Sequence, residues 1–249
     1  MYDFNILKMS DIIRMGSDIR VLGKDCRSME EAAQRLVNYL FDNFVDPQSG
    51  LNTCPLIRFF KTHDHTTLPP ELQRFAARLL TDKSPTANYK CLTLLATTGI
   101  EEKWRRRQNS QAHQAIPLPS KEVVNRIPMM RNLIKQMGMD IETVIRPDPN
   151  LLLDLARTTF NIFYVQQALA SPYIPAQQEF VKPYGIKSVL GYGGILPSGN
   201  IFTVIMFTRK ALDRKTAQLF STVALNVKML MLPFDNNVFA TKIEGETTP

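Results

Sequence analysis

The last third of the chain constrains the fold most, because its pattern is compatible with only one local arrangement. Residues 187–196 (KSVLGYGGIL) are apolar and interrupted by glycine, and residues 201–208 (IFTVIMFT) are β-branched and aromatic. The four residues between these segments, Pro-Ser-Gly-Asn, are turn formers. A helical repeat of apolar residues then begins after Asp213 and continues to Pro233. The sequence therefore predicts a β-hairpin that is followed directly by a long helix.

Three earlier segments also have the composition of strands. They are residues 55–61 (PLIRFFK), 88–97 (NYKCLTLLAT) and 158–165 (TTFNIFYV). We expect them to join the hairpin in one antiparallel sheet of five to six strands. Residues 201–207 are apolar at nearly every position, which indicates that helices cover both faces of the sheet. The predicted fold class is therefore α/β (α+β), a sandwich around one central antiparallel sheet.

Apolar repeats at helical spacing predict the covering helices. Residues 6–24 carry one such stripe, and Ser28 with Glu31 forms a capping box that starts a second helix, which runs to about residue 45. We expect both on one face of the sheet, together with the helix of residues 213–232. A helix over residues 120–137 covers the other face, and Pro128 is expected to kink or divide it. Shorter helices are predicted at residues 70–80, 150–156 and 175–184.

The organisation of the chain indicates one domain. The sequence has no repeat, no low-complexity tract and no linker long enough to separate two domains. We expect a single domain over residues 1–249, with insertions near residues 66–84 and 148–155 and a C-terminal tail or linker at 235–249. The uninterrupted apolar runs are short, and the first residues lack the features of a signal peptide. These properties predict a soluble, cytoplasmic protein that does not interact with membranes.

The positive charge of the chain does not indicate a nucleic-acid partner. The formal net charge is +7, but lysine and arginine are scattered along the sequence. The densest group, Lys103 with Arg105, Arg106 and Arg107, surrounds the single tryptophan, Trp104. Single-strand binding requires further aromatic residues in a common groove. We therefore expect this group to be a solvated loop or helix and expect no nucleic acid as partner.

The complete order of elements resembles that of the GAF family of sensory domains. Three stretches carry the resemblance: residues 99–104 (GIEEKW) followed by 115–118 (AIPL), residues 171–177 (SPYIPAQ) followed by 183–190 (PYGIKSVL), and the hairpin of residues 191–200 (GYGGILPSGN). The last two are similar to a branch of GAF-like domains that precede bacterial sensor kinases and cyclases. The sequence lacks the signature of cyclic-nucleotide-binding GAF domains and the Cys-His pair of bilin-binding ones.

The resemblance implies a sensory or regulatory domain in signal transduction, such as a two-component system, which binds an unidentified small molecule in a pocket between the sheet and the helix of residues 120–137. It also implies a homodimer that pairs through its terminal helices, and a downstream output module, a kinase or cyclase, in cis or in trans. Candidate ligand-binding residues fall on the pocket-side elements of such a domain. They are Trp104, Arg126, Met130, Phe160, Asn161, Tyr164 and Tyr192.

The histidines are weak candidates for a metal or cofactor. His63 and His65 flank Asp64, but this pair supplies too few ligands, and a polar loop after the strand of residues 55–61 is the preferred interpretation. Some GAF sensors bind haem through one histidine, and His113 lies near the expected mouth of the pocket. A solvated loop is preferred for His113 as well, so that the cofactor is unknown and haem is not supported.

Two alternatives to a sensor remain open. A ligand-free scaffold that only dimerises has the same fold, and a GAF-fold thiol enzyme, such as a free methionine sulfoxide reductase, needs reactive cysteines. Cys26, Cys54 and Cys91 match neither a disulfide framework nor a zinc site, and they do not match the cysteines of that reductase. Cys54 follows a polar loop and is expected to be the more accessible thiol. We assign no catalytic residue and expect no enzymatic activity.

Overall fold

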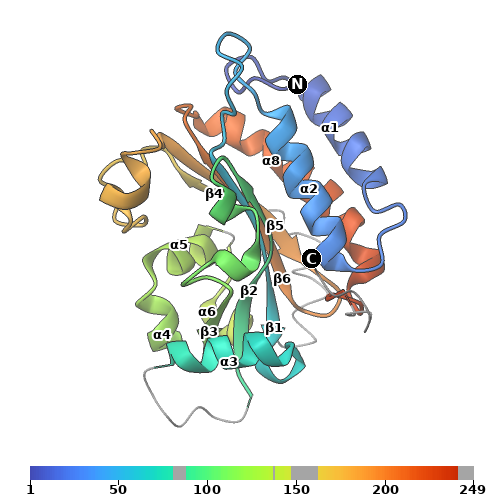
Figure 1. Cartoon of the computed structure of the whole chain (residues 1–249), viewed down its shortest axis with the longest axis vertical. Helices are drawn as coiled ribbons and strands as arrows, with labels where there is room; N and C mark the ends of the chain where they lie inside the picture. The colour runs from blue at the N-terminus through green and yellow to red at the C-terminus, as the bar shows by residue number, and fades with distance from the viewer. Residues whose placement is uncertain (81–87, 137, 147–161, 241–249) are drawn as a thin grey trace.

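The fold is built around one open sheet. The computed structural model describes residues 1–80, 88–136, 138–146 and 162–240. Six antiparallel strands form the sheet in the order β3-β2-β1-β6-β5-β4, and helices lie on both of its faces (Figure 1). The predicted fold class is confirmed: the described residues form a mixed α/β sandwich around one antiparallel sheet.

The C-terminal hairpin forms as the sequence predicted. β5 (Ser188–Ile195) pairs along its whole length with β6 (Ile201–Thr208). Gly193 is required there, because a Cβ atom on this residue would lie 2.0 Å from the carbonyl oxygen of Phe202. β6 pairs on its other side with β1 (Leu56–Asp64), which pairs in turn with β2 (Lys90–Gly99).

The two edge strands are short. β4 (Ile162–Val165) pairs with β5, and the rest of the predicted strand, residues 158–161, lies outside the described residues. β3 (Ala115–Leu118) pairs with β2 and was not predicted as a strand. Pro117 lacks a backbone N–H and so argues against a strand in the sequence, but an edge strand tolerates such a residue.

β1 is longer than predicted, which corrects the interpretation of the segment that follows residue 61. His63 and Asp64 belong to the strand, where they pair with Cys91 and Lys90 of β2. His63 is buried and does not lie in a polar loop. The register between β1 and β2 shifts between Phe59 and Phe60, because Leu95 of β2 has no partner on β1. Leu95 and Ala96 consequently face the same core cluster, an irregularity of β2 that periodicity alone does not reveal.

Three helices cover one face, as expected. α2 (Met29–Asn43) packs on β1 and β2, α8 (Arg214–Met231) packs on β4 and β5, and α1 (Met9–Val21) packs on α8 (Figure 1). The capping residues act as predicted: the Ser28 hydroxyl accepts a hydrogen bond from the backbone N–H of Glu31 at 3.2 Å. The Asp213 carboxylate caps α8 in the same way.

α8 requires a second correction. Residues 214–234 have a mean hydropathy of 1.3 over an 18-residue window, so this helix is long and apolar enough to cross a membrane by length and composition, whereas the sequence analysis expected no such segment. The core helix of a globular domain meets the same criterion. Here 44% of the window is buried in the fold, and Phe220, Ala224 and Val227 pack in the core against the sheet.

The other face carries shorter elements. Pro128 divides the predicted helix of residues 120–137 into α4 (Lys121–Asn125) and α5 (Pro128–Gln136). α6 (Ile141–Ile145) was not predicted. Residues Gln177–Val181 form a π-helical turn within the predicted helix of residues 175–184. The predicted helix of residues 150–156 lies outside the described residues.

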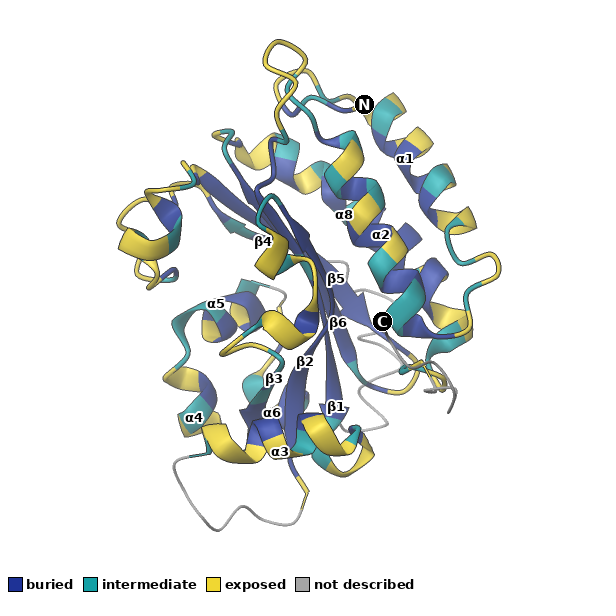
Figure 2. Cartoon of the chain, in the orientation of Figure 1, coloured by how far each residue is buried: buried dark blue, intermediate teal, exposed yellow. Residues whose placement is uncertain are grey.

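α3 (Pro70–Leu79) closes the structure at the β3 edge, where it was expected as a short helix. The residues of the sheet strands are mostly buried, whereas the helices carry many exposed residues (Figure 2). The described residues form three core clusters. One lies between the sheet and α1, α2 and α8, a second between the sheet, α4–α6 and residues 174–186, and a third between α3 and the β2–β3 edge of the sheet.

Candidate functional site

A cavity of about 520 Å³ lies between the sheet and α5. We call it the central cavity. Its floor comes from β1, β2 and β6, its roof from Ile127 and α5, and its side walls from residues 103–116 and 174–184. The apolar lining residues include Leu56, Phe60, Leu92, Ile116, Ile127, Met129, Met130, Leu133, Ile174, Phe180, Ile205 and Phe207. Its size and apolar lining are typical of small-molecule sites.

Aromatic side chains close one wall of the central cavity. The Trp104 ring lies 4.6 Å from that of Tyr184 and 5.5 Å from that of Phe180, and Phe180 meets Phe207 edge to face at 5.0 Å. The Thr97 hydroxyl donates to the carbonyl oxygen of Trp104 at 2.8 Å. This contact ties the tryptophan segment to β2, so that the wall is held by the sheet itself.

Polar groups gather at the mouth of the central cavity. Arg58, Lys103, His113 and Glu179 line both the central cavity and an adjoining polar hollow of about 400 Å³, to which Arg106 also contributes. Burial lowers the pKa of Arg58 to about 10, which leaves its guanidinium charged at neutral pH. His113 is exposed, as expected of a loop residue, and the surrounding protein atoms and then the positive charge of Arg58 lower its pKa. His113 is therefore neutral at pH 7.

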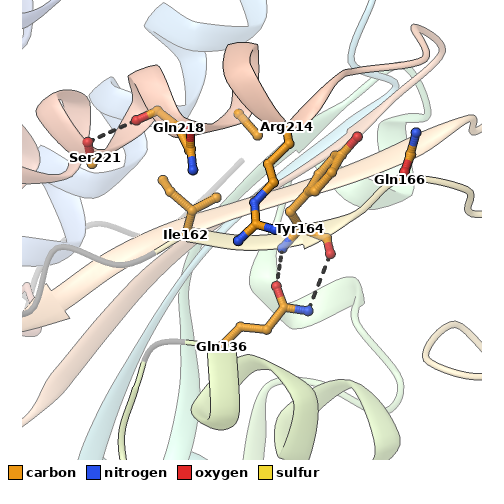
Figure 3. Close-up of a pocket in the computed structure, with 8 residues that line it drawn as sticks. Gln136, Ile162, Tyr164, Gln166, Arg214, Gln218 and Ser221 are labelled. Carbon is orange, nitrogen blue, oxygen red and sulfur yellow. Dashed lines mark hydrogen bonds between the residues drawn. The ribbon is translucent and has the colours of Figure 1, made fainter.

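A second cavity, of about 840 Å³, lies at the β4 edge of the sheet; we call it the lateral cavity (Figure 3). Gln136 reaches into it from α5, and its side-chain amide makes the two backbone hydrogen bonds with β4 that a neighbouring strand would make. Its amide accepts from the backbone N–H of Tyr164 at 2.7 Å and donates to the Tyr164 carbonyl oxygen at 3.3 Å. Arg214, Gln218 and Ser221 of α8 line the opposite side. Because several of its polar groups are already bonded and Arg214 and Gln218 are exposed, this cavity is less suited to enclose a ligand than the central cavity.

The structure brings together only part of the predicted ligand-binding set. Trp104 and Met130 line the central cavity. Tyr164 lines the lateral cavity, and its hydroxyl donates to the carbonyl oxygen of Leu212. Arg126 is exposed at the end of α4 and lines neither cavity. The remaining three are Tyr192, which is fully buried on the α8 face of the sheet, and Phe160 and Asn161, which lie outside the described residues.

Sequence reasoning missed Arg58, although a signal was present. PLIRFFK is an apolar strand with one cation in its middle, and a charge in a strand that is covered on both faces requires an explanation. Phe180 and Tyr184 were missed for a different reason. They belong to an irregular segment, and only the folded chain shows that this segment faces Trp104.

The basic group around Trp104 is not simply solvated. Arg107 is buried, and its guanidinium pairs with the Glu30 carboxylate of α2 at 2.5 Å. The Arg105 guanidinium donates to the carbonyl oxygen of Gly99 at 3.1 Å. Two of its four cations therefore bond to the fold, whereas Lys103, Arg105 and Arg106 are exposed, as expected of a solvated loop, and only the buried Arg107 departs from that expectation.

The histidines that were considered as metal ligands are dispersed. His65 stacks on Tyr89, and His63 lies against Phe239 with its pKa lowered by burial and by the charge of Lys61. His113 lies at the mouth of the central cavity. The described residues contain no group of three His, Cys, Asp or Glu side chains that could hold a metal ion.

The thiols have the properties of core residues. Cys54 and Cys91 are buried, and burial raises the pKa of each to about 12. This corrects the expectation that Cys54 is the accessible thiol: Cys26 is the more exposed, and burial raises its pKa too. A nucleophilic cysteine needs a lowered pKa, which none of the three shows.

No protein-family model matches the sequence, and no curated protein does. Among solved structures, the chain is similar to the N-acylhomoserine lactone-dependent LuxR-family transcription factor CepR2 from Burkholderia cenocepacia, with 9% identity and a TM-score of 0.38 over 89% of this chain and 93% of that one. It is also similar to the phycoerythrobilin-bound GAF domain of a cyanobacterial phytochrome, with 10% identity and a TM-score of 0.40 over 92% and 99% of the two chains. At these values neither similarity bears on the ligand of this chain.

Proposed function

We propose that this chain is a regulatory small-molecule-binding domain whose ligand occupies the central cavity. The observation that carries the proposal is the largely apolar space of about 520 Å³ between the sheet and α5, whose charged lining residues all lie where it adjoins the polar hollow. A domain that served only as a scaffold gains stability by filling such a space with side chains. The proposal assigns no catalytic role to the chain.

The arrangement of β6 supports a regulatory role. Ile205 and Phe207 line the central cavity, whereas the alternate residues Val204 and Met206 belong to the core cluster that contains α8. A ligand that moves β6 therefore acts directly on the packing of α8. Such a ligand shifts the position of the terminal helices by its different affinity for the two arrangements. A kinase or cyclase that contacts these helices, in cis or in trans, is the output module that this proposal requires.

The test uses a neutral apolar fluorophore, N-phenyl-1-naphthylamine. We expect the purified wild-type protein to bind it at one saturable site with enhanced emission. Leu133→Trp fills the central cavity and should abolish this binding, whereas Gln218→Trp in the lateral cavity should leave it unchanged. Absence of saturable binding by the wild type, or binding that survives Leu133→Trp in a folded protein, would contradict the proposal. Ala112→Trp at the mouth replaces Leu133→Trp if that variant does not fold.

A second candidate role, homodimerisation, rests on exposed apolar side chains of α1 and α8. They include Ile13, Val21, Leu225 and Met229. Exposed apolar groups that gather on a surface are typical of association sites. Homodimerisation is compatible with ligand binding in the central cavity, which lies on the other face of the sheet.

A further inference from the structure

Arg58 occupies an unusual position for a cation. It lies on β1, between β2 and β6, where its register partners are Thr97 and Ile205. The strand therefore holds its side chain near the middle of the sheet, on the face that forms the floor of the central cavity. Arg58 lines both the apolar chamber and the polar hollow at its mouth. It is the point at which an apolar environment meets a charged one.

The charge of Arg58 has no partner among the residues that the structure describes. No carboxylate lies within ion-pair distance of its guanidinium, and its Nε atom is buried without a hydrogen-bond acceptor. The other enclosed cations are treated differently. Lys61 lies 3.8 Å from Asp235, Lys90 lies 3.1 Å from Asp64, and Arg107 lies 2.5 Å from Glu30. This fold pairs its other buried cations with carboxylates, so that Arg58 requires a counter-ion that the described residues do not supply, and an anion in the cavity meets this requirement.

The other charged groups around the mouth do not neutralise Arg58. Lys103 and Arg106 add positive charge, and His113 is neutral at pH 7. Glu179 is the one carboxylate among the described residues that line these two spaces, and it forms no ion pair with Arg58. The mouth therefore attracts anions. The chamber behind it, with Leu92, Leu133 and Phe207, favours a hydrocarbon or aromatic body.

We infer that the ligand of the central cavity is an amphipathic organic carboxylate whose charged end binds to the Arg58 guanidinium and whose apolar body fills the chamber. A guanidinium matches a carboxylate in planar, bidentate geometry, which gives specificity for this group over a neutral alcohol. The inference rests on the proposed function, since it names the class of ligand for the same cavity.

The test measures displacement of N-phenyl-1-naphthylamine by decanoate and by 1-decanol, two competitors of equal chain length that differ in charge. The readout is the ratio of their affinities. In Arg58→Met we expect this ratio to shift against decanoate by about tenfold or more, because a charge-assisted hydrogen bond is lost, while the fluorophore itself still binds. Arg58→Gln serves as a second neutral variant if Arg58→Met does not fold. Glu179→Gln should leave the ratio unchanged or shift it towards decanoate.

The possible failures can be told apart. If the wild-type protein does not bind the fluorophore in the central cavity, the proposed function itself fails. If the fluorophore binds but both Arg58 variants retain the wild-type ratio within about twofold, the cavity binds ligands without using this charge, and the inference is overturned. A tenfold loss of decanoate preference in Glu179→Gln would also overturn it, because that result would assign the recognition of the carboxylate to Glu179 and not to Arg58.

Discussion

At the scale of single residues, two tyrosines of neighbouring strands have hydroxyl groups in opposite situations. The Tyr192 hydroxyl is fully buried and has no hydrogen-bond partner among the described residues. The Tyr164 hydroxyl donates to the carbonyl oxygen of Leu212. A buried polar group without a partner costs about 1–3 kcal/mol. The Tyr192 hydroxyl therefore lowers the free energy of unfolding, whereas the Tyr164 hydroxyl raises it.

Tyr192→Phe is expected to raise the free energy of unfolding by about 1 kcal/mol, because it removes an oxygen atom that has lost its hydration and gained nothing. Tyr164→Phe, the matched control, should lower the free energy of unfolding by about 1 kcal/mol through loss of its hydrogen bond. Urea denaturation followed by circular dichroism measures both values. A destabilised Tyr192→Phe would show that this hydroxyl has a partner, such as a bound water.

Lys61 makes stability depend on pH in a defined direction. Burial lowers its pKa to about 8 in the fold, against 10.5 for a free lysine, in spite of the nearby Asp235. Between these two values the unfolded chain binds more protons than the folded one, so that stability rises with pH. We expect the wild type to gain stability relative to Lys61→Met between pH 7 and 10, measured by urea denaturation at each pH. Parallel pH profiles of the two proteins would contradict this assignment.

At the scale of elements, β4 depends on a side chain from the opposite layer. The Gln136 amide bonds both backbone groups of Tyr164 and so protects the edge of the sheet. Gln136→Ala should lower the free energy of unfolding by about 1–2 kcal/mol. Gln218→Ala, which alters an exposed glutamine of the same cavity, should change it by less than about 0.5 kcal/mol. Hydrogen exchange should then show faster exchange of the Tyr164 amide in the first variant alone.

The elements that the sequence predicted are those with a local cause. The hairpin follows from two apolar strands around a turn, α2 and α8 follow from their caps and repeats, and the break before α5 follows from Pro128. β3 and α6 were missed because four or five residues do not establish a period. The site was predicted less well. Trp104 and Met130 were assigned to the pocket correctly, because their position follows from the order of elements, but Tyr192 was assigned to the wrong face of the sheet. Strand alternation across the bulge and the bent segment 174–184 appear only in three dimensions.

At the scale of the whole molecule, α1 and α8 expose apolar side chains that the sheet does not cover. Val223 of α8 is buried and is unsuitable for a test. Leu225 and Met229 are 43% and 48% exposed. We expect the wild type to sediment as a dimer at tens of micromolar and Leu225→Glu with Met229→Glu to sediment as a monomer with the circular dichroism spectrum of the wild type. Leu79→Glu on α3, where the leucine is 40% exposed, is the control and should remain dimeric.

A wild type that sediments as a monomer at high concentration would contradict the proposed homodimer. The ligand proposal would be unaffected, because the central cavity lies on the other face of the sheet. The two proposals therefore succeed or fail independently.

The contact between α1 and α8 limits how the sequence can evolve at two distant positions. A Cβ atom on Gly16 would lie 2.5 Å from the Asn226 amide nitrogen, and Arg20 donates to the Asn226 amide oxygen at 2.6 Å. The Asn226 side chain of α8 therefore occupies the space that a side chain at position 16 of α1 would need. A larger residue at position 16 would displace the Asn226 amide and break its hydrogen bond with Arg20, unless position 226 becomes smaller. Among descendants of this sequence the two positions should therefore vary together, although 210 residues separate them.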